Sequence, residues 1–331
     1  MVNNHEKQLI EFCQVFGLGV AIKQPVEVKG GLLHKLYKVT TDKGEYAIKC
    51  LNSAIMKRES ALQRMKNSEK IAAILGREVP AILGKEINGN HVQLFKEQYF
   101  MVFNWIYGKS IFPPNISEAH CFAIGNLLGK IHRLDISVSG VVIDDEVQQL
   151  FEWNKYLEMR PKENAMWFSI YEESIENLIK YNLKALNAKA VLSENKVISH
   201  RDLDPKNVMW QGSNPYLIDW EAAGYVNPYQ ELLEVLNYWA DDGNGGLVKN
   251  HFITLLNAYK KHKCLDGANW DIVLDSGYEG MLGWLEYNLK RALGIEAASI
   301  DEVEVGEQQI IVTIKELQGY EEKVKLLKEW L

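Results

Sequence analysis

The segment that decides the fold reads His-Arg-Asp-Leu-Asp-Pro-Lys-Asn at residues 200–207, and Leu-Ile-Asp-Trp-Glu follows at residues 217–221. Three of these side chains suit phosphoryl transfer: Asp202, Asn207 and Asp219. Such a transfer needs an acceptor hydroxyl held in line and a cation that neutralises charge on the phosphates. Carboxylate and amide oxygens are ligands that Mg²⁺ prefers. We therefore expect Asn207 and Asp219 to hold magnesium, and Asp202 to accept the proton of the hydroxyl or to orient it.

The same two segments resemble the catalytic and metal-binding loops of the protein-kinase-like superfamily. They are most similar to its aminoglycoside phosphotransferase and choline kinase branch. The resemblance implies a bilobal α+β fold, with a small β-rich amino-terminal lobe and a large, mainly helical carboxyl-terminal lobe. It places the nucleotide-binding lobe at residues 1–103, an interlobe linker at 104–110, and the catalytic and acceptor-binding lobe at 111–331.

Two departures from the protein kinases point to a small-molecule substrate. Asp204 stands where protein serine/threonine kinases usually have a lysine, and the metal loop continues as Trp220 and Glu221 in place of Phe-Gly. Glu221 resembles the choline-kinase pattern of an acidic residue just after the metal-binding Asp. It is a candidate contact for the metal or for a cationic acceptor, or else a loop charge.

The resemblance also predicts a lysine that contacts the α- and β-phosphates of the nucleotide. Tyr-Ala-Ile-Lys at residues 46–49 resembles the strand signature that carries this lysine, which makes Lys49 the candidate. A glutamate on the following helix is expected to pair with Lys49. Glu69 and Glu59 are both candidates, and the distance of Glu69 from Pro80 matches the family arrangement better.

A glycine turn and an aromatic segment complete the expected nucleotide site. Gly30 and Gly31 occupy the place of the turn that covers the phosphates, where glycine permits close approach of the backbone. A plain hairpin turn is the alternative. His34 and Lys35 are candidate phosphate donors or exposed side chains. Phe103 and the nearby Trp105 lie where the linker of the family binds adenine.

Local patterns predict the elements that carry these residues. Residues 26–31 read as a strand entering a turn, and residues 36–51 read as a hairpin with its turn at Asp42 to Gly44. One helix is expected over residues 56–75. Two strands are expected on either side of an Asn-Gly turn at residues 88–90, the second near residues 98–105. The chain beyond residue 108 is mostly helical in pattern, except at residues 197–220.

Composition bounds the function classes. The chain has 331 residues, of which 47% are hydrophobic and 24% charged, with a formal net charge of −7. This composition excludes intrinsic disorder, and the acidic balance disfavours nucleic acid or an anionic membrane as the main partner. Residues 1–100 carry a basic excess and the remainder an acidic one, which suits an anionic ligand and a cationic ligand respectively. Four scattered cysteines and no visible secretory signal predict the cytoplasm.

Taken together, the sequence predicts an ATP-dependent, Mg²⁺-requiring kinase that phosphorylates a hydroxyl of a small, cationic molecule, either aminoglycoside-like or choline-like. GTP in place of ATP, and the oligomeric state, stay open. Two alternatives are a nucleotide-binding scaffold without turnover and a kinase acting on protein. The resemblance implies that acidic and aromatic side chains border the acceptor cleft, namely Asp241, Asp242, Glu279, Trp284, Glu286 and Tyr287.

Overall fold

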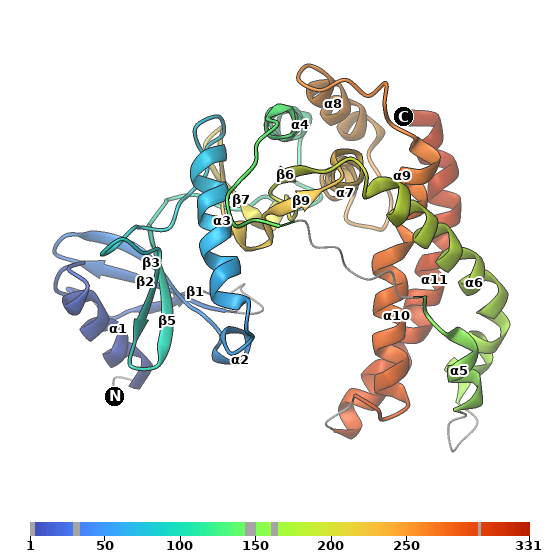
Figure 1. Ribbon diagram of the computed structural model, residues 1–331, viewed down its shortest axis with the longest axis horizontal. Coiled ribbons are helices and arrows are strands. Elements are labelled where there is room, and N and C mark those ends of the chain that lie inside the picture. Colours follow the sequence, from blue (N-terminus) through green and yellow to red (C-terminus); the bar gives the residue numbers. More distant parts are fainter. Residues whose placement is uncertain (1–3, 29–33, 143–149, 160–164, 297–298) are drawn as a thin grey trace. The chain divides into compact units, whose positions relative to one another are not determined.

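The computed structural model describes residues 4–28, 34–142, 150–159, 165–296 and 299–331, and Figure 1 labels its helices and strands. Contacts within the chain divide it into two compact units. Unit 1 comprises Met1–Ile116, Lys130–Val142 and Ile198–Tyr225, and unit 2 comprises Ser117–Gly129, Ile143–Val197 and Val226–Leu331. The predicted α+β class is confirmed, because an antiparallel sheet is followed by a mostly helical remainder. The linker at residues 104–110 stays a prediction.

Unit 1 is built on a five-stranded sheet in which every neighbouring pair is antiparallel. The strand order is β1-β2-β3-β5-β4. The predicted hairpin at residues 36–51 is confirmed, since β2 and β3 pair from Lys35↔Cys50 to Thr41↔Gly44. The strands are β1 (Val26–Val28), β2 (Lys35–Thr41), β3 (Gly44–Cys50), β4 (Val92–Phe95) and β5 (Gln98–Asn104).

The two faces of β3 have different neighbours, because successive side chains of a strand point to opposite faces. Ile48 joins Phe12 of α1 (Asn4–Val15) in a buried cluster on one face. Lys49 pairs with Met101 of β5, whose side chain is buried against α2 (Ser53–Met56) and α3 (Ala61–Leu75). Lys49 therefore lies on the face of the sheet that carries α2 and α3.

The structure corrects the single helix predicted over residues 56–75. The chain forms α2, then a turn, then α3 from Ala61 onward. Met56 and Ala61 are both buried in one cluster. Five residues along a continuous helix turn a side chain by about 140° from the starting face, at roughly 100° per residue. Interrupting the helix lets both residues reach the same core.

The prediction of a strand before the Asn-Gly turn was also wrong. Asn88 and Gly89 do adopt left-handed conformations, but they close only an isolated bridge between Ile87 and Asn90. The hairpin turn joining β4 to β5 is formed by Lys96 and Glu97, both of which have positive φ. The backbone before Asn88 is engaged elsewhere, since the amide of Lys85 donates to Val102 O at 2.6 Å.

The last segment of unit 1, Ile198–Tyr225, carries the predicted catalytic residues on short strands and single turns. Leu217 connects them to the segment after α3, because its amide donates to Pro80 O and its carbonyl accepts from Ile82 N, both at 2.9 Å. The elements are β6 (Val197–Ser199), the 3₁₀ turn η1 (Pro205–Asn207), β7 (Val208–Gln211), β8 (Asn214–Leu217), the 3₁₀ turn η2 (Trp220–Ala222) and β9 (Gly224–Val226).

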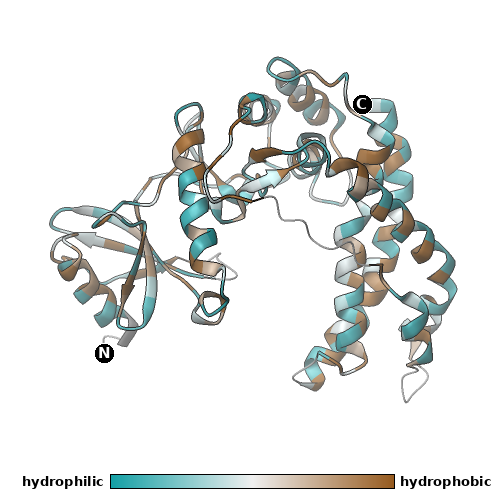
Figure 2. Ribbon diagram, in the orientation of Figure 1, coloured by the Kyte–Doolittle hydropathy of each residue, from teal (hydrophilic) through white to brown (hydrophobic). Residues whose placement is uncertain are grey.

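Unit 2 is helical, and its long helices bury apolar stripes that Figure 2 shows in brown. Tyr278 stacks on Tyr181 with ring centroids 4.5 Å apart and meets Tyr320 edge-on at 4.9 Å. Gly277 is needed beside them, because a Cβ there would lie 2.0 Å from the Tyr320 hydroxyl. The helices are α5 (Trp153–Glu158), α6 (Met166–Leu192), α7 (Pro228–Ala240), α8 (Lys249–Lys260), α9 (Trp270–Ser276), α10 (Tyr278–Ala292) and α11 (Ile300–Trp330), and the unit boundary falls within α4 (Glu118–Arg133).

No helix among the described residues has the length and apolar character needed to span a membrane.

Candidate active site

The predicted catalytic and metal-binding loops lie next to each other in unit 1. The β7–β8 hairpin returns the chain, so that Ile218 N donates to Asn207 O at 3.0 Å. His200 Nε2 donates to Ile218 O at 3.0 Å, and the His200 ring lies 4.5 Å from the ring of Trp220. These contacts place Asp219 beside the loop that carries Asn207.

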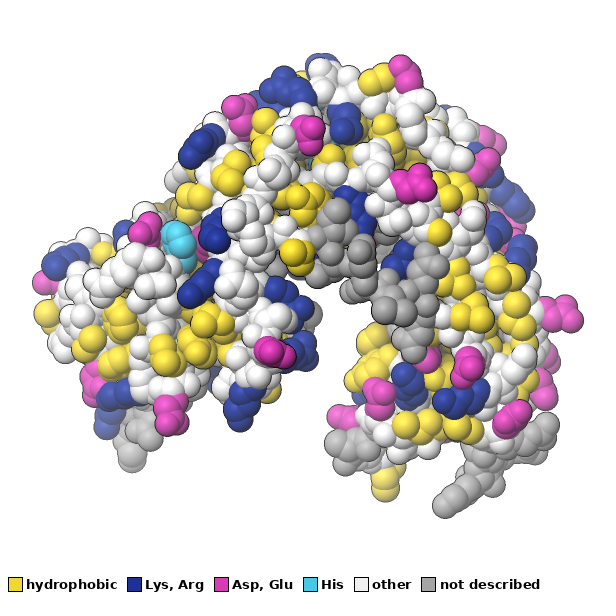
Figure 3. Space-filling view, in the orientation of Figure 1, with side chains coloured by type: hydrophobic (Ala, Val, Ile, Leu, Met, Phe, Trp, Pro, Cys, Tyr) yellow, Lys and Arg dark blue, Asp and Glu magenta, His cyan; other side chains and the backbone are white. Residues whose placement is uncertain are grey.

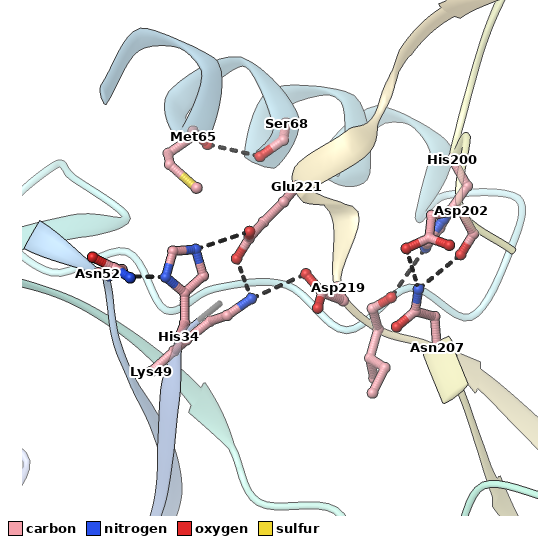
Figure 4. A network of polar contacts seen from close by, with 11 residues as sticks. His34, Lys49, Asn52, Met65, Ser68, His200, Asp202, Asn207, Asp219 and Glu221 are labelled. Carbon is pink, nitrogen blue, oxygen red and sulfur yellow. Dashed lines mark hydrogen bonds and ion pairs between the residues drawn. The ribbon is translucent and has the colours of Figure 1, made fainter. Parts of the chain in front are cut away.

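Asn207 is fixed by the residue predicted to handle the acceptor hydroxyl (Figure 4). Its amide Nδ2 donates to both the backbone oxygen and Oδ2 of Asp202, each at 2.8 Å. Asn207 is buried, whereas 35% of the Asp202 side chain is exposed. Because Nδ2 faces these two acceptors, Oδ1 of Asn207 is directed away from them and keeps its lone pairs for another ligand.

Asp219 forms an ion pair with Lys49 of β3. Asp219 has a left-handed backbone with φ 59° and ψ 65°, which is uncommon for a residue other than glycine and is enriched at functional sites. Lys49 Nζ donates to Asp219 Oδ1 at 3.0 Å and also contacts Glu221 Oε1. Burial lowers the pKa of Lys49, but Asp219 and Glu221 outweigh it and leave the pKa above its usual value. Lys49 is therefore positively charged at neutral pH.

Glu221 is held by a second partner that the sequence did not pair with it. His34 Nε2 lies 3.1 Å from Glu221 Oε2, and the side chain of His34 is 3% exposed. Burial acts to raise the pKa of Glu221, but the bonds from His34 and Lys49 outweigh it and lower the pKa below its usual value. His34 is thus neither exposed nor directed at solvent.

The Lys49–Glu69 pair expected from the sequence is not formed. Among the described residues, Lys49 has ion pairs with Asp219 and Glu221. Glu69 lies on α3 and is buried, and its Oε2 accepts a hydrogen bond from Gly84 N at 2.8 Å. Burial raises the pKa of Glu69, and the nearby positive charge of Lys49 offsets only part of this rise.

Lys206 is a site residue that the sequence reasoning missed. Its Nζ lies 3.3 Å from Asp202 Oδ1 and 3.8 Å from Asp204 Oδ2. Asp204 Oδ1 accepts from Lys206 N at 2.8 Å and caps the 3₁₀ turn, while Ser110 Oγ donates to Lys206 O at 3.2 Å. The sequence signal was a lysine four residues after Asp202 and directly before Asn207, the predicted metal ligand.

The predicted adenine contacts lie at the end of β5. Phe103 is half-buried and packs on the cluster that includes Met101. Trp105 N donates to Glu45 O at 3.0 Å, and its buried indole Nε1 has no partner among the described residues. Gly30 and Gly31, the predicted phosphate-covering turn, lie outside the described residues.

The chemistry of the donor set fits magnesium. Asn207 supplies an amide oxygen directed away from Asp202, and Asp219 supplies a carboxylate whose side chain is 42% exposed. Both are hard oxygen ligands, and Mg²⁺ typically binds through one or two such groups together with phosphate oxygens and water.

Comparison with known proteins gives the family. Residues 26–265 match the phosphotransferase enzyme family. The chain belongs to this family. Its sequence has no match among curated proteins. The family match confirms the resemblance stated from the two loops, and aminoglycoside phosphotransferases and an ethanolamine kinase are among the solved structures that share the fold.

Solved structures of other phosphotransferases share the fold. A spectinomycin phosphotransferase in complex with ADP and spectinomycin has a TM-score of 0.67 at 14% identity, covering 95% of this chain and 98% of that chain. Amicoumacin kinase with AMP-PNP and Ca²⁺ has a TM-score of 0.65 at 12% identity, with 95% and 94% covered. Ethanolamine kinase from Plasmodium vivax has a TM-score of 0.53 at 15% identity, with 88% and 82% covered.

In this phosphotransferase, two of the four carboxylates expected to meet a cationic acceptor, Glu279 and Glu286, pair with lysines of unit 2. Glu279 pairs with Lys189 at 2.7 Å. Glu286 pairs with Lys290 at 3.1 Å and accepts from the Tyr156 hydroxyl at 2.8 Å. Figure 3 shows acidic and basic side chains interspersed over the visible face of α6, α10 and α11. Glu279 and Glu286 are therefore each neutralised by a lysine of the chain.

Proposed function

We propose that this phosphotransferase moves the γ-phosphoryl group of ATP to a hydroxyl of a small molecule. The observation that carries the proposal is the double hydrogen bond from Asn207 to Asp202, in a loop that is bonded directly to the loop of Asp219. This brings a proton acceptor and two oxygen ligands of the types required for the reaction into one part of unit 1.

Lys49 is proposed to bind the α- and β-phosphates of the nucleotide. Its ammonium group carries a charge at neutral pH, because two carboxylates raise its pKa against the effect of burial. Phe103 and Trp105 are proposed to contact adenine. Similar proteins have been solved with ADP, AMP or AMP-PNP, which supports a nucleotide as the co-substrate.

Asn207 and Asp219 are proposed to hold Mg²⁺. When bound there, the ion would neutralise charge on the phosphate oxygens. The chain's own contribution is orientation, because the bond from Asn207 Nδ2 to Asp202 directs the amide oxygen of Asn207 away from that carboxylate.

Asp202 is proposed to accept the proton of the acceptor hydroxyl as the oxygen attacks phosphorus. Its Oδ2 is fixed by Asn207 and its Oδ1 lies near Lys206, so the carboxylate is held from both sides. A positioned general base typically contributes about 10²–10⁴-fold to the rate.

The acceptor is proposed to be a small cationic molecule, aminoglycoside-like or choline-like. The similar structures include spectinomycin, amicoumacin and ethanolamine kinases. Because Glu279 and Glu286 are paired with lysines of this chain, an acceptor amine that uses these carboxylates would share them with Lys189 or Lys290 or replace these lysines.

The test is incubation of the purified protein with ATP, Mg²⁺ and a panel of aminoglycosides, choline, ethanolamine, sugars and nucleosides, with products read by mass spectrometry. We expect at least one compound to gain a phosphoryl group, and chelation of Mg²⁺ to stop the reaction. Labelled protein bands from a lysate would point to a protein substrate instead. Nucleotide binding with no product from any of these would favour the non-catalytic scaffold.

A further inference from the structure

Both carboxylate oxygens of Glu221 are already engaged. Oε1 contacts Lys49 Nζ, and Oε2 lies 3.1 Å from His34 Nε2. The side chain of Glu221 is 23% exposed, and both partners are less exposed, at 14% and 3%. A shift of this side chain toward a metal ion or a cationic acceptor would weaken the contact with Lys49 or the one with the buried His34, and weakening a buried hydrogen bond is costly. The arrangement therefore assigns Glu221 to Lys49.

His34 is fixed through both ring nitrogens. Its Nδ1 accepts a hydrogen bond from Asn52 N at 2.8 Å, so the proton of the neutral ring is on Nε2 and is donated to Glu221. Asn52 is the N-cap of α2, and its Oδ1 accepts from Ala54 N. The imidazole therefore links the first turn of α2 to the carboxylate that holds Lys49, as Figure 4 shows.

Glu69 has a different hydrogen-bond partner from Glu221 and a different structural role. Its Oε2 accepts from Gly84 N at 2.8 Å, and a Cβ on Gly84 would lie 3.1 Å from the same oxygen. The next residue, Lys85, donates its amide to Val102 O of β5. Glu69 thus supports the backbone that runs alongside β5, and it can do so as a neutral hydrogen-bond acceptor.

We propose that Glu221, oriented by His34, positions Lys49 for the phosphates of the nucleotide. Glu221 thereby takes the role that was expected of Glu69. The inference rests on the proposed role of Lys49 in binding phosphate. Asp219 is the other partner of Lys49, but it is also the proposed metal ligand. Glu221 is then the carboxylate that remains with Lys49 when nucleotide and metal are bound. A lysine side chain loses much rotamer freedom when ordered, so holding it in advance favours binding.

The experiment measures binding of ADP in the presence of Mg²⁺ by calorimetry to the full chain and three glutamine variants. Glu221→Gln removes the charge next to Lys49, and we expect ADP affinity to fall about tenfold, the size of effect typical of a hydrogen bond to a charged group. Glu69→Gln keeps an acceptor for Gly84 N, and we expect a change of no more than about twofold. Glu78→Gln, on an exposed residue, is the matched control.

A double-mutant cycle tests whether His34 acts through Glu221. We expect His34→Ala to weaken ADP binding in the wild-type background and to add nothing in the Glu221→Gln background. Thermal stability should fall in both backgrounds, because Asn52 N loses its acceptor in each. His34→Gln, which can still donate to Glu221, should restore part of the affinity and carries the test if Glu221→Gln does not fold.

The outcomes separate this inference from the proposed function. A larger loss of ADP affinity in Glu69→Gln than in Glu221→Gln would overturn the inference and reinstate Glu69 as the partner of Lys49. The inference would also be overturned if the His34 and Glu221 substitutions had additive effects on ADP affinity. Absence of ADP binding to the wild-type chain would instead refute the proposed function, on which the inference depends.

Discussion

Asn207 donates both hydrogens of its side-chain amide to Asp202, one to the backbone oxygen and one to Oδ2, each at 2.8 Å. A single side chain thereby orients the proposed base and presents its own oxygen as a proposed metal ligand. The two roles depend on different atoms of Asn207, so substitutions can separate them.

Replacing Asn207 with Asp should keep an oxygen ligand but remove both donors to Asp202. We expect the turnover number to fall about 10–100-fold, the usual effect of losing a group that orients a site, while the Mg²⁺ concentration for half-maximal rate changes little. Asn207→Ala should impair both quantities. Steady-state rates measured across a Mg²⁺ titration check this, and equal behaviour of the two variants would contradict the division of roles.

Lys206 places a positive charge beside Asp202, where the negative charge of the transferred group would arrive. We expect Lys206→Met to lower the turnover number about tenfold, as expected for loss of a charge-assisted contact, with little change in thermal stability because an exposed ion pair contributes little to folding. Lys206→Arg should retain more of the rate. If Lys206→Met has wild-type turnover, Lys206 has no part in the reaction.

The buried Glu69 predicts a pH dependence of stability with a definite sign. Burial raises its pKa above the usual 4.5, and the hydrogen bond from Gly84 and the nearby charges of His91 and Lys49 do not fully reverse this. The folded state then holds the proton at pH values where the unfolded chain has lost it. This contribution to stability is fully present below pH 4.5 and is lost as the pH rises through the folded-state pKa.

Glu69→Gln removes the titration and keeps an acceptor for Gly84 N. The variant should therefore gain thermal stability relative to the wild type as the pH rises from 4.5 to neutral, and the gap should close below 4.5. Calorimetric scans over this pH range measure the difference. A gap that is independent of pH would contradict the proposed effect of burial.

Phe12 anchors α1 on the sheet. It is fully buried, and its ring lies 4.5 Å from Phe16, 4.6 Å from Phe100 and 6.0 Å from Phe95. Phe12→Ala should lower the free energy of unfolding by about 3–5 kcal/mol, because it removes a large apolar side chain and leaves a cavity. Denaturant titration measures this, with the exposed Phe122→Ala as the matched control. A loss below about 1 kcal/mol would mean that the site collapses around the smaller side chain.

The sequence predicted the parts of the fold that depend on local pattern. The alternation of residues 36–51 was sufficient for the β2–β3 hairpin and placed Lys49 on a strand. The Asn-Gly turn at Asn88 formed as expected, but it closed a single bridge, while Lys96 and Glu97 made the hairpin turn. Turn residues indicate where the chain reverses its direction. Whether strands form on both sides of that turn depends on pairing with distant segments.

The candidate site was predictable in its residue types and less so in its pairings. Fixed spacing within one loop was enough to name Asp202 and Asn207, which the structure joins by hydrogen bonds. The partner of Lys49 was not predictable from spacing, because Glu69 on the following helix bonds Gly84 instead, whereas Glu221 lies 172 positions further along the chain. The contact between His34 and Glu221 links residues 187 positions apart, and no local pattern carries it.

The most direct test of the account compares Asp202→Asn with the wild type in two measurements, ADP affinity and the single-turnover rate of phosphoryl transfer to an acceptor found in the panel. Asparagine preserves the size of the side chain but accepts a proton poorly. We predict an ADP affinity within about twofold of the wild type and a transfer rate lower by about 10²–10⁴-fold, the usual contribution of a general base. A variant that transfers the phosphoryl group at the wild-type rate would contradict the central claim that Asp202 handles the acceptor hydroxyl.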